Sequence, residues 1–200
     1  IVSMQSVDSI AAIPQDLIWR LDVEKYHAMI AAGILTDDDP VELLEGWLVF
    51  KMPKNPRHRA ATKLVREAIE ERLPEDWYVD SQEPITIGNS EPEPDVVVVR
   101  GDTRQYLDRH PGPADIGLVV EVSDTTLDRD RGVKKQTYAR AGIPIYWIVN
   151  LVDSQVEAYS QPSEAEVDYL LRQDYSLLAN LPINLDGNCL DMVKVSSLFP

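Results

Sequence analysis

Three apolar segments indicate the centre of a β-sheet. They cover residues 96–99, 116–123 (apolar as far as Glu121) and 145–149, and four consecutive valines form the first of them. β-Branched side chains suit a pleated surface, and no polar residues alternate with the apolar ones. These segments are therefore predicted to be strands that are buried on both faces.

Three further segments are predicted to be helices. Residues 21–30 have Asp22 as their N-cap and Gly33 as their stop, and residues 130–141 end before Gly142. The core face of the first of these helices is predicted to consist of Val23, Tyr26, Met29 and Ile30. Residues 59–73 give the clearest amphipathic pattern, and this predicted helix ends before Pro74. Their apolar face consists of Ala61, Leu64, Val65, Ala68, Ile69 and Leu73.

Shorter apolar segments predict the remaining strands. These are residues 47–52 in a hairpin through Glu45-Gly46, residues 77–80 and 84–87, and antiparallel additions at 156–159 and 167–171, with one or two short strands after them. The order predicts an α/β (α+β) protein with one mixed central sheet flanked by helices and added antiparallel strands. We expect an N-terminal arm over residues 1–21 and a single domain over residues 22–200.

The charge of the chain is strongly negative but uneven. The 200 residues carry a net charge of −15, which opposes non-specific binding to nucleic acid. Residues 51–66 nevertheless contain six basic residues and no acid, and residues 129–140 contain five basic residues and one acid. Each basic segment is either a local phosphate-binding surface or a solvated helix face.

Composition also limits where the protein acts. No apolar run reaches the roughly 18 residues of a membrane helix, and no export signal is visible, so we expect a cytoplasmic protein without membrane contact. The single cysteine, Cys189, lies in an apolar, strand-like segment and is predicted to be a buried thiol.

Two acidic residues stand at the borders of the buried strands. Asp95 precedes the valine segment after Glu91-Pro92-Glu93-Pro94, and Glu121 lies near the end of the next buried strand. Neighbouring strands are about 4.8 Å apart, so two carboxylates at one sheet edge repel each other unless a proton or a cation lies between them. A hard divalent cation such as Mg²⁺ suits this arrangement. Alternatively, each carboxylate pairs separately with an arginine or a loop amide.

The helix after Glu121 supplies a lysine. Lys134, Tyr138 and Ala141 share one side of this helix, which is the side with its larger apolar residues, so Lys134 is predicted to point towards the sheet. Lys135 is predicted to face solvent. Two carboxylates, a metal ion and a lysine form a set that cleaves phosphodiesters, because the metal activates water and the lysine stabilises the developing charge.

The chain also resembles a known family. Pro94-Asp95 and Glu121-Val122-Ser123 are similar to the motif of the PD-(D/E)XK nuclease superfamily. The closer resemblance is to its predicted restriction-endonuclease family, long a domain of unknown function and abundant in cyanobacteria. This resemblance runs from about residue 23 to residue 151. Its further pieces are Glu42-Leu43-Leu44-Glu45-Gly46, His58, Asp130-Arg131-Gly132-Val133-Lys134 with Tyr138-Ala139, and Ala141-Gly142-Ile143-Pro144 before Tyr146-Trp147-Ile148-Val149.

The resemblance implies a restriction-endonuclease-like core and a Mg²⁺- or Mn²⁺-dependent nuclease acting on DNA. It implies Asp95 and Glu121 as metal ligands. Ser123 stands where the superfamily motif has lysine, and the resemblance to the family implies that the catalytic lysine has migrated to the following helix, which here means Lys134. A nuclease-fold protein of little or no activity, acting as a nucleic-acid-binding or regulatory module, is the alternative.

Several assignments stay open at the level of sequence. Glu42 or Glu45 either adds a carboxylate to the site or lies on an exposed hairpin, and His58 either contacts phosphate or has a structural role. Glu93 is a further ligand or the partner of a basic segment. RNA or another phosphate ester is an alternative substrate, a homodimer is suggested by the terminal extensions, and no organic cofactor is expected.

Overall fold

A six-stranded mixed sheet forms the centre of the protein. The computed structural model describes residues 17–200. The sheet has the order β3-β4-β5-β6-β7-β8, and its one parallel pair is β5 with β6. The strands are β3 (Trp77–Asp80), β4 (Val96–Arg100), β5 (Ile116–Ser123), β6 (Ile145–Asn150), β7 (Gln155–Ser163) and β8 (Asp168–Ser176). The predicted mixed central sheet with antiparallel additions is confirmed.

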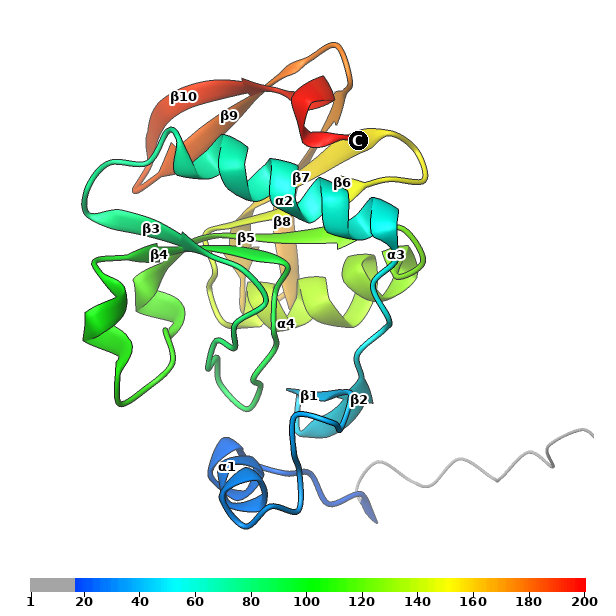
Figure 1. Cartoon of the computed structure of the whole chain (residues 1–200), viewed down its shortest axis with the longest axis vertical. Coiled ribbons are helices and arrows are strands. Elements are labelled where there is room, and N and C mark those ends of the chain that lie inside the picture. Colours follow the sequence, from blue (N-terminus) through cyan, green and yellow to red (C-terminus); the bar gives the residue numbers. More distant parts are fainter. Residues whose placement is uncertain (1–16) are drawn as a thin grey trace, which may run out of the picture.

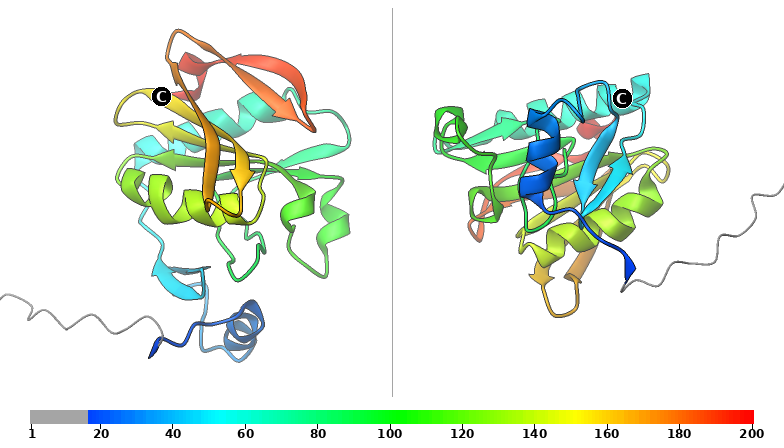
Figure 2. Two further views of the ribbon diagram at one scale, coloured as in Figure 1. Left: turned by 180° about the vertical axis from the view of Figure 1, so that it is seen from behind. Right: turned by 90° about the horizontal axis from the view of Figure 1, so that it is seen from below.

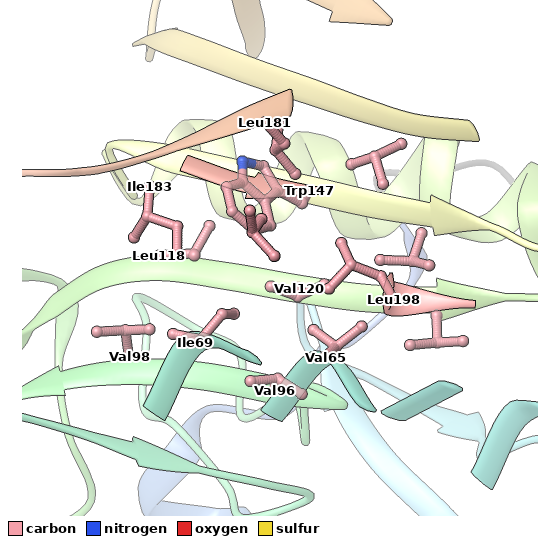
Figure 3. Close-up of a cluster of buried hydrophobic side chains, with 14 of the residues drawn as sticks. Val65, Ile69, Val96, Val98, Leu118, Val120, Trp147, Leu181, Ile183 and Leu198 are labelled. Atoms are coloured by element: carbon pink, nitrogen blue, oxygen red, sulfur yellow. The ribbon is translucent and has the colours of Figure 1, made fainter. Parts of the chain in front are cut away.

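Helices cover both faces of this sheet (Figure 1). On one face, α2 (Pro56–Glu70) packs with Val65 and Ile69 against Val96 and Val98 of β4. The hairpin of β9 (Asn180–Leu185) and β10 (Asn188–Lys194) and the 3-10 helix Val195–Leu198 lie on the same side (Figures 1 and 2). Figure 3 shows this core, with Trp147 of β6 between the sheet and β9.

The opposite face packs against a broken helix. It consists of α3 (Leu127–Arg129), the π-helical segment Asp130–Lys134 and α4 (Lys135–Arg140). Tyr138 and Ala139 of α4 belong to the core that includes Val97 and Val99 of β4 and Ile116 and Val119 of β5. Successive side chains of a strand point to opposite faces of the sheet, and both faces are covered by a hydrophobic core. All four valines of β4 are therefore buried.

The N-terminal elements lie at one end of the molecule, below the sheet in Figure 1. They are α1 (Val23–Ala31) and the hairpin of β1 (Val41–Leu44) and β2 (Trp47–Phe50), with short 3-10 helices at Thr103–Tyr106 and Pro113–Asp115 elsewhere. The Asp22 side chain caps α1 by accepting from Lys25 N–H, as predicted. An isolated bridge joins Leu43 of β1 to Glu91, which brings the hairpin to the segment before Asp95.

Several predicted boundaries are wrong. The helix predicted at 59–73 spans Pro56–Glu70, because Asn55 caps it and Pro56 suits the first helical position. The helix predicted at 130–141 begins at Leu127, and its backbone leaves helical geometry at Gly132. Residues 84–87 form no strand beyond a single bridge between Ile87 and Ser90.

Two single-residue predictions also fail. Cys189 is exposed, because β10 pairs with β9 alone and turns most of its side chains outward. Ile30, predicted on the core face of the first helix, is exposed, whereas Tyr26 is buried. Residues 1–16 of the predicted arm lie outside the described residues, and the single-domain prediction stays a prediction. No helix of the described residues is long and apolar enough to cross a membrane.

Candidate active site

The register of β4 and β5 brings Asp95 and Glu121 together. These strands are antiparallel and pair Val96 with Val120, so Asp95 and Glu121 are the next residues along and face the same side. Both are nearly buried, with 6% and 3% of their surface exposed. They line one cavity of about 50 Å³ that opens between the hairpin, the start of α2 and the broken helix.

Lys134 reaches into this cavity from the π-helical segment. Its Nζ lies 2.8 Å from Oε1 of Glu121 and 3.4 Å from Oε1 of Glu42. Tyr138, one turn later, donates a hydrogen bond to Glu121 Oε1 at 2.7 Å. Lys135 instead pairs with Asp168 at 2.8 Å on another side of the molecule. Lys134 therefore has the orientation that its helix face predicts.

Asp95 is held from two directions. The backbone N–H of Val122 and the Nε2 of His58 each donate to its Oδ2, at 2.9 and 3.0 Å. Burial raises the pKa of Asp95, but the hydrogen bonds from His58 and Val122 and the positive charge of His58 and Lys134 together hold the pKa below its ordinary value. His58 therefore has a partner within the site, and Asp95 is the carboxylate that stays ionised.

Glu121 has the opposite character. Burial raises its pKa to about 8, because Lys134 compensates only part of the desolvation and Asp95 adds repulsion. Burial also opposes the charge of Lys134, yet Glu121 and Glu42 hold the pKa of this lysine above its ordinary value. At neutral pH the cavity thus combines an ionised Asp95, a charged Lys134 and a Glu121 that readily takes up a proton or exchanges it for a cation.

The donor set suits a hard divalent cation. All acidic side chains of the cavity offer oxygen, the ligand that Mg²⁺ prefers. Glu42 Oε1 and Asp130 Oδ1 are buried there without a hydrogen-bond partner among the described residues. A buried oxygen without a hydrogen bond is costly. The charge of Lys134, 3.4 Å from Glu42 Oε1, offsets part of this cost for Glu42, and an ion in the cavity would add the missing contacts. Asp95 and Glu121 line the same cavity, and Lys134 Nζ lies beside Glu121.

The structure separates the two early glutamates. Glu42 is 1% exposed and contacts Lys134, and its Oε2 accepts from the backbone N–H of Glu93. Glu45 follows the strand and pairs with Arg140 at the surface. Glu93 lies at the rim of the cavity and pairs with Lys51 at 2.9 Å. Of these acids, Glu42 alone reaches the interior of the site.

Asp130 is a buried acid of the family-like segment to which the sequence gives no role. Its Oδ2 accepts from Ser123 Oγ at 2.6 Å and from Thr126 Oγ1 at 2.5 Å. Ser123 thus occupies the motif position of the lysine and contacts an acid instead. Burial raises the pKa of Asp130 although Lys134 lowers it. The signal in the sequence is weak: a serine, a threonine and an aspartate at helical spacing are also common in exposed caps.

The two basic segments differ in how far they are neutralised. All five basic residues of 129–140 have acidic partners, namely Glu42, Glu157, Glu121, Asp168 and Glu45. In residues 51–66, Lys54 and Arg59 have no ion pair among the described residues, and Lys54 lines the cavity. The first segment therefore retains free positive charge near the site, whereas the second stabilises the fold.

Comparisons with known proteins find a matching sequence family and a protein of similar fold. The model of the family Uma2, described as "Putative restriction endonuclease", matches residues 23–188. A crystal structure from Anabaena variabilis, described as "a putative nuclease belonging to DUF820", is similar with a TM-score of 0.61 and 15% sequence identity. The similarity covers 84% of this chain and 94% of that one. The comparison with curated proteins gives no match.

Proposed function

Because the chain belongs to the Uma2 family of restriction-endonuclease-like proteins, we propose that it hydrolyses DNA phosphodiester bonds with a divalent cation, Mg²⁺ or Mn²⁺. One observation carries the proposal: Asp95, Glu121 and Lys134 line a single cavity, with Lys134 Nζ 2.8 Å from Glu121. These are the residue types that metal-dependent phosphodiester cleavage requires. The description of the Anabaena variabilis protein as a nuclease gives further support.

Each residue has a distinct role in this proposal. Asp95 and Glu121 hold the cation, which when bound neutralises phosphate charge and acidifies a water molecule. Lys134 orients the attacking water or stabilises the negative charge that develops on the phosphate oxygens. His58 keeps Asp95 ionised and in place, and Tyr138 fixes one oxygen of Glu121.

DNA is the proposed substrate on the basis of family membership and of the free basic residues at the rim. Lys54 lines the cavity and Arg59 follows on the exposed side of α2. Both can contact phosphates, while the net charge of −15 keeps non-specific binding of DNA to the rest of the surface weak. The test is a cleavage assay of the protein on plasmid DNA, single-stranded oligonucleotides and RNA, each with Mg²⁺, with Mn²⁺ and without metal. Cleavage of RNA but not DNA would contradict the proposed substrate.

A homodimer is part of the proposal because two active sites are needed to cut both strands of a duplex at once. Trp47, Leu48 and Phe50 of β2 are exposed, with Phe50 exposed by 71%, and provide an apolar surface. Sedimentation equilibrium is the test. A monomer at micromolar concentration that cuts both strands in one encounter would contradict this part.

A binding or regulatory module with little catalysis is the second candidate. Lys134 is held between two glutamates, and Ser123 stands at the motif position of the lysine. Calorimetry with Mg²⁺ followed by plasmid cleavage separates the candidates. Metal-dependent DNA binding without cleavage over a long incubation favours the module, whereas product formation favours the nuclease.

A further inference from the structure

A second group of ligands lies outside the catalytic cavity. Two of the three histidines of the chain, His27 of α1 and His110 of the loop before β5, converge on Glu91. Their ligand atoms all lie within 4.8 Å of one another, and this is the one such group of three His, Cys, Asp or Glu side chains among the described residues. Neither histidine belongs to the family motif or to the catalytic cavity.

The distances are close to those of a metal site. His27 Nε2 lies 2.7 Å from Glu91 Oε2, and His110 Nε2 lies 3.9 Å from Glu91 Oε1. Ligand atoms at about 2.0–2.2 Å from a tetrahedral Zn²⁺ are separated by roughly 3.3–3.6 Å. Small rotations of the two imidazoles, which are 46% and 41% exposed, would therefore bring all three residues to coordination distance.

The side chain of Glu91 is held in one position by burial and hydrogen bonds. Its side chain is only 4% exposed. Its backbone N–H donates to Leu43 O at 2.7 Å, and Thr86 Oγ1 donates to its Oε2 at 2.8 Å. A hydrogen bond from a neighbour to a coordinating carboxylate is the usual outer support of a metal site. A buried carboxylate that faces two imidazoles differs in this respect from an incidental surface pair.

We infer that His27, Glu91 and His110 bind a late first-row divalent metal ion, with Zn²⁺ as the representative. Two imidazole nitrogens and one carboxylate oxygen favour such an ion over Mg²⁺. The three residues line an open pocket of about 800 Å³, so a remaining coordination position is accessible to water. The ion would tie α1 and the 107–112 loop to the segment that leads to Asp95.

Zinc binding is tested in the full chain with Asp95→Asn and Glu121→Gln in place, because these changes remove the two carboxylates that are proposed to hold the cation of the catalytic cavity. We expect this parent to bind one equivalent of Zn²⁺ in competition with a chromophoric chelator and to retain it in excess Mg²⁺. Adding His27→Ala and His110→Ala should abolish binding. The matched control, His58→Ala in the same parent, removes the third histidine and should leave zinc binding unchanged.

Spectroscopy and unfolding provide independent measurements. Co²⁺ in the parent should give the visible absorption of a site with nitrogen ligands, and Zn²⁺ should raise its Tm. Both effects should disappear in the double-histidine variant, whose circular dichroism should be unchanged because His27 lies on an exposed helix face where alanine is favourable. Equal zinc affinity with and without the two imidazoles, or no zinc bound by the parent, would overturn the inference.

Discussion

Lys134 is the residue on which the proposed chemistry depends most. It is buried, and its charge is retained because Glu121 and Glu42 surround it. Lys134→Ala should lower the cleavage rate about 10²–10³-fold, the usual effect of removing one group that stabilises developing charge. Mg²⁺ binding, measured by calorimetry, should be retained because Asp95 and Glu121 remain.

Lys135→Ala is the matched control for this prediction. Lys135 is the next residue and carries the same charge, but it pairs with Asp168 outside the cavity. Its substitution should leave the rate within a few-fold of the wild type. If Lys135→Ala abolishes cleavage and Lys134→Ala does not, the assignment of the catalytic lysine is wrong.

Single residues show how far the sequence can predict the site. The inward orientation of Lys134 follows from helical spacing alone, since Tyr138 lies one turn away on the same face. The burial of Glu42 does not, because it depends on a contact with Lys134 that is distant in sequence. Local pattern likewise could not show that β10 lacks a covering layer, which is why Cys189 is exposed rather than buried.

At the scale of elements, the start of α2 positions His58. The Asn55 side chain caps the helix by accepting from His58 N–H at 2.9 Å, and its amide donates to Asp124 at 2.6 Å. Asn55→Ala should lower the free energy of unfolding by about 1 kcal/mol, as measured by urea denaturation, and should reduce cleavage through His58 and Asp95. Asn55→Ser keeps a capping oxygen and should retain most of the stability. Equal loss in both variants would exclude capping as the cause.

The broken helix after β5 is the element that sequence patterns describe least well. A continuous helix over residues 130–141 is the simplest prediction, but the π-helical segment and the break at Gly132 change the relation between its two ends. Asp130 thereby contacts Ser123 while Lys134 contacts Glu121. Such π segments often occur at functional sites, and their position depends on tertiary contacts rather than on residue spacing.

Glu157 in β7 provides a test of the sheet's stability. Its side chain is fully buried and accepts from Arg131, Asn150 and Tyr159. Burial raises its pKa, but the hydrogen bonds, first that of Arg131, lower it from 4.5 to about 2. Because the folded-state pKa is depressed, the stabilisation is present above pH of about 4.5 and is lost as the pH falls towards 2.

We therefore expect Glu157→Gln to lower the free energy of unfolding by about 3 kcal/mol at pH 7. The difference from the wild type should shrink as the pH falls from about 5 to about 2, measured by urea denaturation at each pH. Glu166→Gln, at an exposed position in the β7–β8 turn, should have little effect at any pH. A difference that does not change with pH would show that the ionised carboxylate is not the stabilising group.

At the scale of the whole molecule, the central sheet could be predicted because β4, β5 and β6 are apolar on both faces and the helix α2 has an apolar stripe. The packing of the β1–β2 hairpin against Glu91, and hence the third carboxylate beside Lys134, could not be predicted, since no local pattern encodes that contact. The same holds for the basic residues 129–140, whose charge is neutralised by acidic residues of the β1–β2 hairpin, β5, β7 and β8.

The central claim is that Asp95 and Glu121 bind the divalent cation that cleavage of DNA requires. The direct measurement is plasmid cleavage as a function of Mg²⁺ concentration for the wild type, Asp95→Ala and Glu121→Ala, with circular dichroism to show that each variant is folded. We predict cleavage that depends on Mg²⁺ in the wild type and is absent in both variants. Metal-dependent cleavage that survives both substitutions would contradict the claim.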